Sequence, residues 1–259
     1  MKTAHNPDQC VVTSGDDNAP FRLFCFPFAG GGASAFRQWS PHLPDKFQIC
    51  AVQPPGRENR IMETPRADVR TLIDVLLPEL EPFLDRPHVF LGHSTGALVA
   101  FEIIRELRRR TQPLPLHLVV SGSRAPHIPE PFPLHDLPHD EFIQGLKRFS
   151  GTPEIVLENQ ELMELFVPIL RADLAIEETY KFYKEAPLNI PISAFYGTED
   201  TEAPQTVVSP WNDHTSCPFS EHAIQGGHFF IKSNMDSFLS QISKILKQIH
   251  SQNTFLLNV

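Results

Sequence analysis

Ser94 stands in the pentapeptide GHSTG (92–96), between the apolar run HVFL and a helical pattern that begins at GALVAFE. The pattern G-x-S-x-G in this setting is typical of a serine nucleophile on a tight, strained turn. Gly92 and Gly96 are needed there because larger side chains would collide with the strand and the helix. The alternative is a serine that only caps the helix after it.

A serine hydroxyl is a weak nucleophile at neutral pH, so it needs a base that is oriented by an acid. Both are expected downstream of Ser94, each on a loop that follows a strand. Asp200 follows an apolar run in AFYGTEDTEAP (194–204), and His228 follows a Gly-Gly turn in HAIQGGHFFI (222–231). We therefore expect Asp200 and His228 to complete a catalytic triad.

Neighbouring residues of the same types leave alternatives open. Glu199 and Glu202 are rivals for the acid, and His214 and His222 are rivals for the base. His93 is too close to the turn to face the serine, and we expect it to pack beneath that residue.

Two backbone N–H groups must stabilise the oxyanion that forms during attack. One is that of Thr95, directly after the serine and at the start of a helix. The other is expected from FPFAGGG (26–32), the early glycine loop that could bring a backbone N–H close to Ser94. An ordinary glycine turn is the alternative interpretation of this loop.

Apolar runs and amphipathic patterns alternate along the chain and must position these residues. Strands are predicted at the start of FRLFCFPFAGGGASAF (21–36) and in FQICAVQPPG (47–56), HVFLGHS (88–94), LHLVVSGS (116–123) and IPISAFYGTED (190–200). Helices are predicted in TLIDVLLPELEPFL (71–84), GALVAFEIIRELRRR (96–110) and MDSFLSQISKILKQIH (235–250). This alternation predicts the α/β class, with a mostly parallel central sheet that is flanked by helices on both faces.

The stretch from residue 125 to residue 187 breaks the alternation. It has no strand pattern and contains the helical patterns HDEFIQGLKRF (139–149) and QELMELFVPILRADLAIEETYKFY (160–183). We expect an inserted helical lid over the carboxyl edge of the sheet, with Pro168 interrupting or kinking its long helix. The remaining parts are a core of residues 21–124 and 188–250, a flexible N-terminal tail of residues 1–20 and a C-terminal tail of residues 251–259.

Composition limits the classes of function. The chain has 259 residues and a net charge of −9, which disfavours nucleic acid as a partner because phosphate binding needs a basic surface. No apolar stretch approaches the ~18–20 residues that span a membrane, and the N-terminus lacks the apolar core of a secretory signal. Cys10, Cys25, Cys50 and Cys217 lack metal-ligand spacing, so we expect reduced cytoplasmic thiols and no metal site. The protein is also expected to be a monomer.

Six segments together resemble, in order and spacing, the stand-alone type II thioesterases of polyketide and nonribosomal peptide biosynthesis. They are FCFPFAGGGASAF, VQPPGRENR, FLGHSTGALVAFE, LRADLAIEETY, FYGTEDTEAP and GGHFFI. The resemblance implies an α/β-hydrolase fold with a mobile lid. It implies a serine thioesterase that removes stalled or aberrant acyl groups from the phosphopantetheine arm of acyl or peptidyl carrier proteins, with no cofactor of its own.

The resemblance also assigns roles to residues of these motifs. Ser94 is the nucleophile, His228 the base and Asp200 its partner, while the N–H groups of Ala29 and Thr95 form the oxyanion hole. A thiolate is a good leaving group because thiol pKa values lie near 8.5. Thioester hydrolysis therefore depends less on a general acid than amide cleavage does.

Two residues depart from the family pattern and affect the acyl pocket. Phe28 stands where His or Tyr often precedes Ala-Gly-Gly, and Thr95 stands where Met is usual after the serine. Aromatic residues of the lid are expected to wall an acyl chamber, with lid core as the alternative for each: Phe132, Phe142, Phe149, Phe166 and Phe182.

The segment RELRRR (105–110) is the one dense basic cluster of the sequence. A solvated helix end is one interpretation of it. The other is a docking patch for the carrier protein, with the candidates Arg105, Arg108, Arg109 and Arg110. Arg57 and Arg60 are expected to be structural ion-pair partners rather than phosphate ligands.

Other functions fit parts of the pattern. A hydrolase of acyl-CoA or small esters would use the same triad. A carrier domain would carry phosphopantetheine on Ser94, but such domains are short helical bundles, whereas here an apolar strand leads into the serine. A cyclising thioesterase is disfavoured because the chain starts at Met1 with no carrier domain ahead of it.

Overall fold

Seven strands form one sheet in the computed structural model, which describes residues 10–149 and 160–254. Their order is β1-β3-β2-β4-β5-β6-β7, and every neighbouring pair is parallel except β1 with β3. The strands are β1 (Val11–Ser14), β2 (Phe21–Phe26), β3 (Phe47–Val52), β4 (His88–His93), β5 (Leu118–Ser121), β6 (Ile192–Gly197) and β7 (Phe219–Ile224). The predicted α/β class with a mostly parallel sheet is confirmed.

Helices connect most of the strands. The α-helices are α1 (Val69–Leu80), α2 (Thr95–Arg109), α3 (His139–Leu146), α5 (Gln160–Glu178), α6 (Gln205–Val208), α7 (Phe230–Ser233) and α8 (Met235–Asn253). The short 3₁₀ helices are η1 (Ala33–Phe36), η2 (Ser40–His42), η3 (Glu58–Arg60), η4 (Glu81–Phe83), η5 (Lys147–Phe149) and η6 (Ser209–His214).

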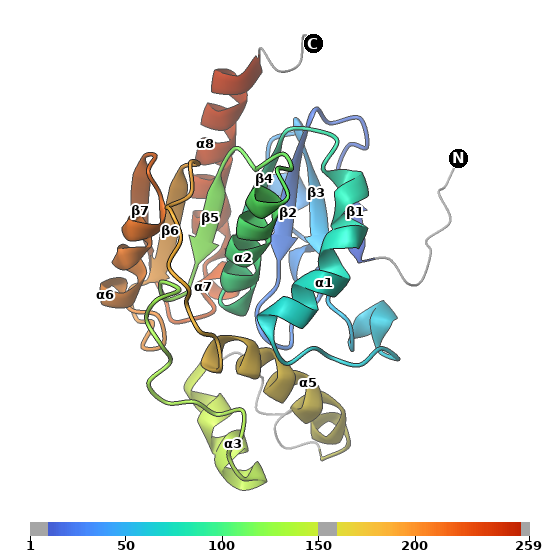
Figure 1. The fold of residues 1–259 in the computed structure, drawn as a ribbon, viewed down its shortest axis with the longest axis vertical. Helices are drawn as coiled ribbons and strands as arrows, with labels where there is room; N and C mark the ends of the chain where they lie inside the picture. The colour runs from blue at the N-terminus through green and yellow to red at the C-terminus, as the bar shows by residue number, and fades with distance from the viewer. Residues whose placement is uncertain (1–9, 150–159, 255–259) are drawn as a thin grey trace.

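Both faces of the sheet are covered, because successive side chains of a strand point to opposite faces. In β4, Phe90 packs in a core shared with α1 and α2, whereas Leu91 packs in a second core with α8. Figure 1 shows α1 and α2 in front of the sheet and α8 behind it. β4 is therefore buried along its whole length, and Ser94 follows directly at its carboxyl end.

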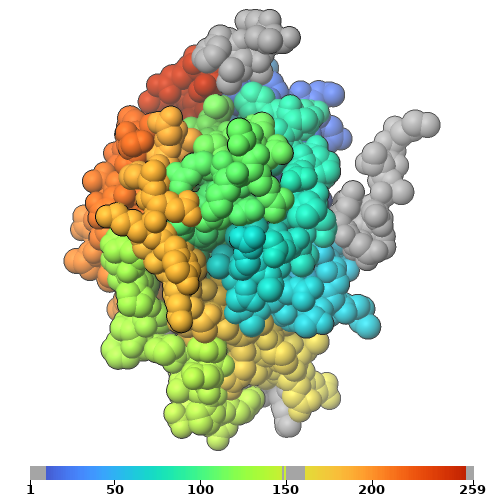
Figure 2. Space-filling model, in the orientation of Figure 1, coloured from blue at the N-terminus to red at the C-terminus, as the bar shows by residue number. Residues whose placement is uncertain are grey.

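The segment predicted as a lid contains α3, η5 and α5. These elements share a small core of their own, in which Phe142 and Leu146 pack against Leu170 and Leu174. Figure 1 shows α3 and α5 together at one end of the sheet, and Figure 2 shows the same segments at that end of the molecular surface. The division into core and lid at the stated bounds stays a prediction.

Three expectations are corrected or limited by the structure. Residues 11–14, predicted as part of a flexible tail, form β1 because they pair with β3 and bury Val11. Pro168 does not interrupt α5, which continues through it. Residues 1–9 and 255–259 of the predicted tails lie outside the described residues.

None of the described helices combines the length and apolar character that crossing a membrane requires. No group of three or more histidines, cysteines or acidic residues in these parts of the chain is arranged to hold a metal ion. Cys10, Cys25, Cys50 and Cys217 are all free thiols.

Candidate active site

Ser94 occupies a strained turn between β4 and α2. Its backbone has φ 52° and ψ −127°, a conformation that side chains other than glycine rarely adopt. A Cβ atom on Gly92 would lie 2.3 Å from the carbonyl oxygen of Gly96, and one on Gly96 would lie 2.2 Å from that of Phe26. The two glycines therefore supply the space that this turn requires, and the serine projects from it.

His228 joins the serine to an acid. Its Nε2 lies 3.1 Å from Ser94 Oγ, and its Nδ1 lies 2.9 Å from Asp200 Oδ2. All three side chains are buried. Because the carboxylate only accepts, Nδ1 carries the proton, and Nε2 is left to accept the serine proton.

Asp200 follows β6 and is held in its ionised form. Its Oδ1 accepts hydrogen bonds from the backbone N–H groups of Glu202, at 2.9 Å, and Ala203, at 3.0 Å. Burial alone would raise the pKa of this carboxyl, but the His228 imidazole and the two amides hold the pKa below its ordinary value. The acid is thus fixed in position and charged at neutral pH.

The side chains of the rival residues do not take part in this hydrogen-bonded series. Glu199 is exposed, and the contact of Glu202 with Asp200 comes from its backbone. His214 contacts His127, with 2.8 Å between ring nitrogens, and His222 stacks on Phe195. The structure brings Ser94, Asp200 and His228 together and leaves these four aside, while the catalytic roles themselves stay predictions.

His93 lies beneath the serine, where it was expected. It is fully buried, its Nδ1 lies 3.0 Å from Ser121 Oγ, and its ring contacts Phe28. Burial lowers its pKa well below the ordinary histidine value, and the neighbouring His228 lowers it further. A neutral ring at this place adds no competing charge to the site.

The two expected oxyanion donors come from separate loops. Thr95 is the first residue of α2, where backbone N–H groups have no acceptor within the helix. Ala29 follows β2, and the chain then turns at Gly30, which has φ 75°. Their roles as donors stay predictions.

A buried ion pair fixes the loop of Ala29 to the lid. Asp173 of α5 accepts a hydrogen bond from the Gly30 N–H at 2.7 Å and pairs bidentately with Arg57, whose Nη2 lies 2.8 Å from Asp173 Oδ1. Arg57 also donates to the Gly31 carbonyl at 3.2 Å. One lid residue thereby sets the position of the predicted oxyanion loop, and Arg57 is an ion-pair partner as expected.

The aromatic residues proposed for an acyl chamber divide into separate groups. Phe142 is completely buried in the lid core and Phe166 packs against that core. Phe132 is 70 % exposed, and Phe28 is buried against His93 rather than in the lid. For Phe142 the chamber interpretation is wrong, because its ring faces the lid interior.

Phe149 and a small cavity lie directly at the catalytic residues. The Phe149 and His228 ring centroids are 5.6 Å apart. The cavity at Ser94 has a volume of about 20 Å³, roughly the space of one water molecule. This space is too small for an acyl group, so the described arrangement leaves room at Ser94 for a water molecule only.

Two lid residues of the site were not singled out from the sequence. Asp173 lies within LRADLAIEETY and binds the loop of Ala29, and Glu177 lies four residues later and lines the cavity at Ser94. Spacing of four residues places two side chains on one face of a helix, so it could have indicated both. What this spacing does not reveal is that this face packs against the Ala29 loop and the cavity at Ser94.

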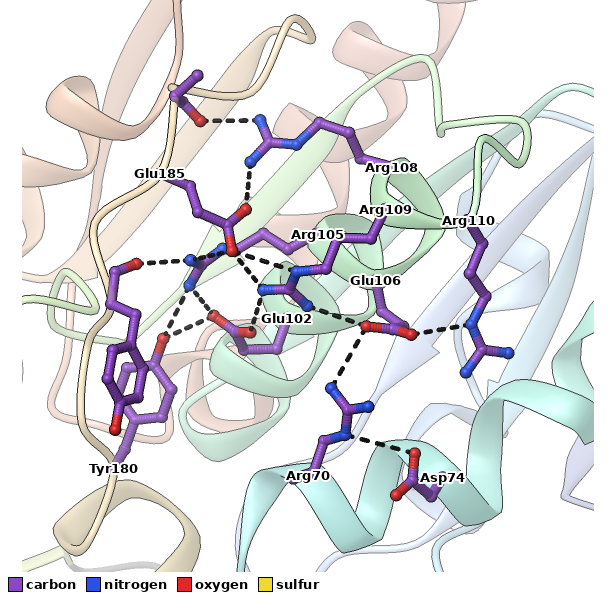
Figure 3. Close-up of polar contacts among 12 residues, drawn as sticks. Arg70, Asp74, Glu102, Arg105, Glu106, Arg108, Arg109, Arg110, Tyr180 and Glu185 are labelled. Atoms are coloured by element: carbon purple, nitrogen blue, oxygen red, sulfur yellow. Dashed lines mark hydrogen bonds and ion pairs between the residues drawn. The ribbon is translucent and has the colours of Figure 1, made fainter.

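The arginines proposed for docking form an ion-pair network at the end of α2 (Figure 3). Arg105 is only 2 % exposed and pairs with Glu102 and Glu185, so its assignment to a docking surface is wrong. Arg108 and Arg109 also pair with Glu185, and Arg110 pairs with Glu106. Docking by Arg108, Arg109 and Arg110 stays a prediction, although these glutamates neutralise much of their charge.

Comparisons with known proteins agree on one family. The family model for the thioesterase domain matches residues 21–246. The gramicidin S biosynthesis protein GrsT of Aneurinibacillus migulanus is 39% identical over 232 residues, which is 89% of this chain and 91% of that protein.

Two solved structures are similar in fold and sequence. The RedJ thioesterase from the prodiginine biosynthetic pathway of Streptomyces coelicolor has a TM-score of 0.83 and 35% identity, over 88% of this chain and 91% of that one. YbtT, a type II thioesterase from the yersiniabactin NRPS/PKS pathway, has a TM-score of 0.82 and 33% identity, over 93% and 99% of the two chains. The predicted α/β-hydrolase fold is confirmed by this similarity.

Proposed function

This chain belongs to the thioesterase family, and on that premise we propose that it releases aberrant or stalled acyl groups from the phosphopantetheine arm of carrier proteins. Its relatives are named for gramicidin, prodiginine and yersiniabactin pathways, which supports an editing role in polyketide or nonribosomal peptide assembly. The observation that carries the proposal is the hydrogen-bonded series Ser94–His228–Asp200 next to a small covered cavity.

Hydrolysis proceeds in two steps. His228 Nε2 takes the proton of Ser94 Oγ as that oxygen attacks the thioester carbonyl, and the resulting imidazolium is stabilised by Asp200. The arm leaves as a thiol with the proton from His228, and the acyl group remains as an ester on Ser94. His228 then deprotonates a water molecule, which attacks the ester and restores the serine.

The carrier protein is the proposed partner, and the phosphopantetheine arm belongs to that partner. We place the protein in the cytoplasm and treat it as a monomer. The four free cysteines, Cys10, Cys25, Cys50 and Cys217, support a reducing compartment.

A comparison of three substrate types tests this function. The acyl-loaded carrier domain, the same acyl group on coenzyme A, and its p-nitrophenyl ester are each offered to the purified protein, and the free acid and free thiol are measured by mass spectrometry. We expect the highest kcat/KM on the carrier and no turnover by Ser94→Ala. A strong preference for the coenzyme A thioester or the plain ester would favour a small-molecule hydrolase instead.

A mass measurement tests the non-enzymatic alternative. Treatment with a phosphopantetheinyl transferase is expected to leave the mass of the protein unchanged. Addition of one phosphopantetheine arm would identify Ser94 as an attachment site and contradict the proposed function.

A further inference from the structure

Phe149 connects the lid to the catalytic histidine. It is the last residue of η5, and its ring centroid lies 5.6 Å from that of His228, with an angle of 65° between the two ring planes. Its side chain also packs against the lid core that contains Phe142 and Leu174. One partly buried aromatic ring therefore lies between the interior of the lid and the imidazole that contacts Ser94.

Phe149 also borders the cavity at Ser94. Among the described residues of that border, Phe149 and Leu174 are the large apolar side chains, and the others are glycine, alanine or polar residues. An apolar acyl chain is stabilised where it leaves water and contacts other apolar groups. We therefore expect an acyl chain that starts at Ser94 to run along the wall formed by Phe149 and Leu174.

An acyl group on the nucleophile needs space that a bordering side chain now fills, because the cavity measures only about 20 Å³. Leu174 is 6 % exposed and belongs to the lid core, and Glu178 accepts hydrogen bonds from two backbone amides of the lid. Glu130 pairs with Arg124 at 2.9 Å. Phe149 is only partly buried at the end of a three-residue helix, so its ring moves with less loss of packing than these neighbours do.

We propose that Phe149 determines which acyl groups the enzyme accepts: its ring fills the space next to Ser94, and its displacement costs more as the acyl chain becomes longer. An acetyl or propionyl group requires a small displacement of the ring. A hexanoyl or octanoyl chain requires the ring to leave the wall altogether, so the enzyme discriminates against it. The inference rests on the proposed thioesterase function and names the residue that selects among acyl groups at the same site.

The contact with His228 makes the larger displacement costly. Aromatic ring pairs are stabilised beyond the area that they bury, and a ring that leaves the wall loses this contact as well as its packing on the lid core. A smaller side chain at position 149 removes that cost and leaves open space beside Ser94. Truncation of Phe149 should therefore increase turnover of long acyl chains, which loss of a purely structural residue would not do.

A series of acyl groups on one carrier domain provides the test. The carrier is loaded with acetyl, butyryl, hexanoyl or octanoyl groups, and kcat/KM is measured for the wild type, Phe149→Leu and Phe149→Ala. The quantity compared is the ratio of kcat/KM for the hexanoyl carrier to that for the acetyl carrier. Because both values come from one preparation, this ratio does not depend on the fraction of the protein that is folded.

We expect Phe149→Ala to raise the hexanoyl-to-acetyl ratio by roughly 10- to 100-fold, within the range that one methylene group produces in an apolar pocket. Phe149→Leu should raise it by a smaller factor, roughly 2- to 10-fold, because leucine still fills part of the space.

Phe83→Ala is the matched control. Phe83 is also partly buried and also ends a three-residue 3₁₀ helix. It precedes the amino end of β4, however, whereas Ser94 follows the carboxyl end of that strand. The hexanoyl-to-acetyl ratio of Phe83→Ala should equal that of the wild type.

Two results would overturn the inference. An equal loss of kcat/KM on all four acyl groups in both Phe149 variants would mean that the ring only holds His228 in place. An unchanged or lowered ratio in both variants would mean that the ring does not select among acyl groups. Either result, with the wild type active on the carriers, leaves the proposed function intact; a wild type inactive on every acyl-loaded carrier would instead contradict the proposed function and the inference with it.

Discussion

At the scale of single residues, the site depends on hydrogen bonds that fix protons as well as positions. The carboxylate of Asp200 accepts from His228 Nδ1 and from two backbone amides, so it cannot turn away from the imidazole. This arrangement keeps the imidazole in the tautomer that accepts the Ser94 proton. Glu199, one residue earlier, points to solvent and offers no such contact.

The choice of acid is therefore testable by removing one charge at a time. We expect Asp200→Asn to lower kcat by roughly 10⁴-fold, because an amide can donate to Nδ1 and stabilise the wrong tautomer. Steady-state hydrolysis of an acyl-loaded carrier measures this effect. Glu199→Gln is the matched control and should remain near the wild-type rate. A larger loss in Glu199→Gln than in Asp200→Asn would transfer the role to Glu199.

At the scale of elements, α5 and the loop that carries Ala29 are joined by one carboxylate. Asp173 of α5 binds both Arg57 and the Gly30 N–H, and these residues come from three separate parts of the chain. A buried ion pair of this kind is costly to break, because removing one partner leaves the other charge without compensation. The helix that closes the site thus also positions the loop that carries Ala29.

We expect Asp173→Asn to lower the free energy of unfolding by about 3–5 kcal/mol, because Arg57 then remains buried without a counter-charge. We also expect kcat to fall by roughly 100-fold, because the Gly30 N–H loses a charged acceptor and the loop shifts. Urea unfolding and carrier hydrolysis measure the two effects separately.

The double variant Arg57→Met/Asp173→Leu separates stability from catalysis. Both charges are gone, so much of the lost stability should return. The low kcat should persist, since Gly30 still has no carboxylate to bind. Recovery of kcat together with stability would mean that neither the ion pair nor the hydrogen bond to Gly30 is needed to hold the loop, and that the loss in Asp173→Asn comes from the uncompensated charge of Arg57.

At the scale of the whole molecule, several histidines are buried in neutral form. His214 is 6 % exposed, and burial together with the nearby His127 lowers its pKa to about 4. Burial also lowers the pKa of His117 to about 4, and it lowers those of His88 and His93. These histidines lie in different parts of the sheet and its flanking loops, so protonation acts on the fold as a whole.

We expect stability to fall as the pH decreases from about 6.5 to about 4. The unfolded chain binds protons near the ordinary histidine pKa of 6.5, whereas folded His214 binds them near 4, so lowering the pH in this window favours unfolding. His214 alone should contribute about 2 kcal/mol between pH 7 and pH 5. Urea unfolding at the two pH values measures the loss.

Two variants assign this loss to the buried ring. His214→Asn removes the titrating group and should reduce the difference in stability between pH 7 and pH 5, although it starts from a lower stability. His139→Asn changes an exposed histidine and should leave the difference unchanged. Equal unfolding midpoints of the wild type at both pH values would contradict the expectation.

The sequence by itself determined the features that depend on local pattern. Gly92, Ser94 and Gly96 specify a turn that only small flanking residues allow, and alternating apolar strands and amphipathic helices specify the α/β class. Asp200 and His228 were recognisable because each follows a strand and a glycine turn at the edge of the sheet where the serine lies. The strands themselves could be predicted from continuous apolar runs, because parallel strands are buried on both faces.

Other features arise where elements that are distant in the sequence pack together, and only the tertiary structure decided them. Arg57 and Asp173 are 116 residues apart, and nothing local predicts that they pair. The sequence predicts that Arg105 belongs to an exposed basic patch, whereas in the structure its side chain is enclosed by Glu102 and Glu185. Glu177 reads as an ordinary helical glutamate, because its position beside Ser94 arises only when α5 packs near α2 in the folded chain.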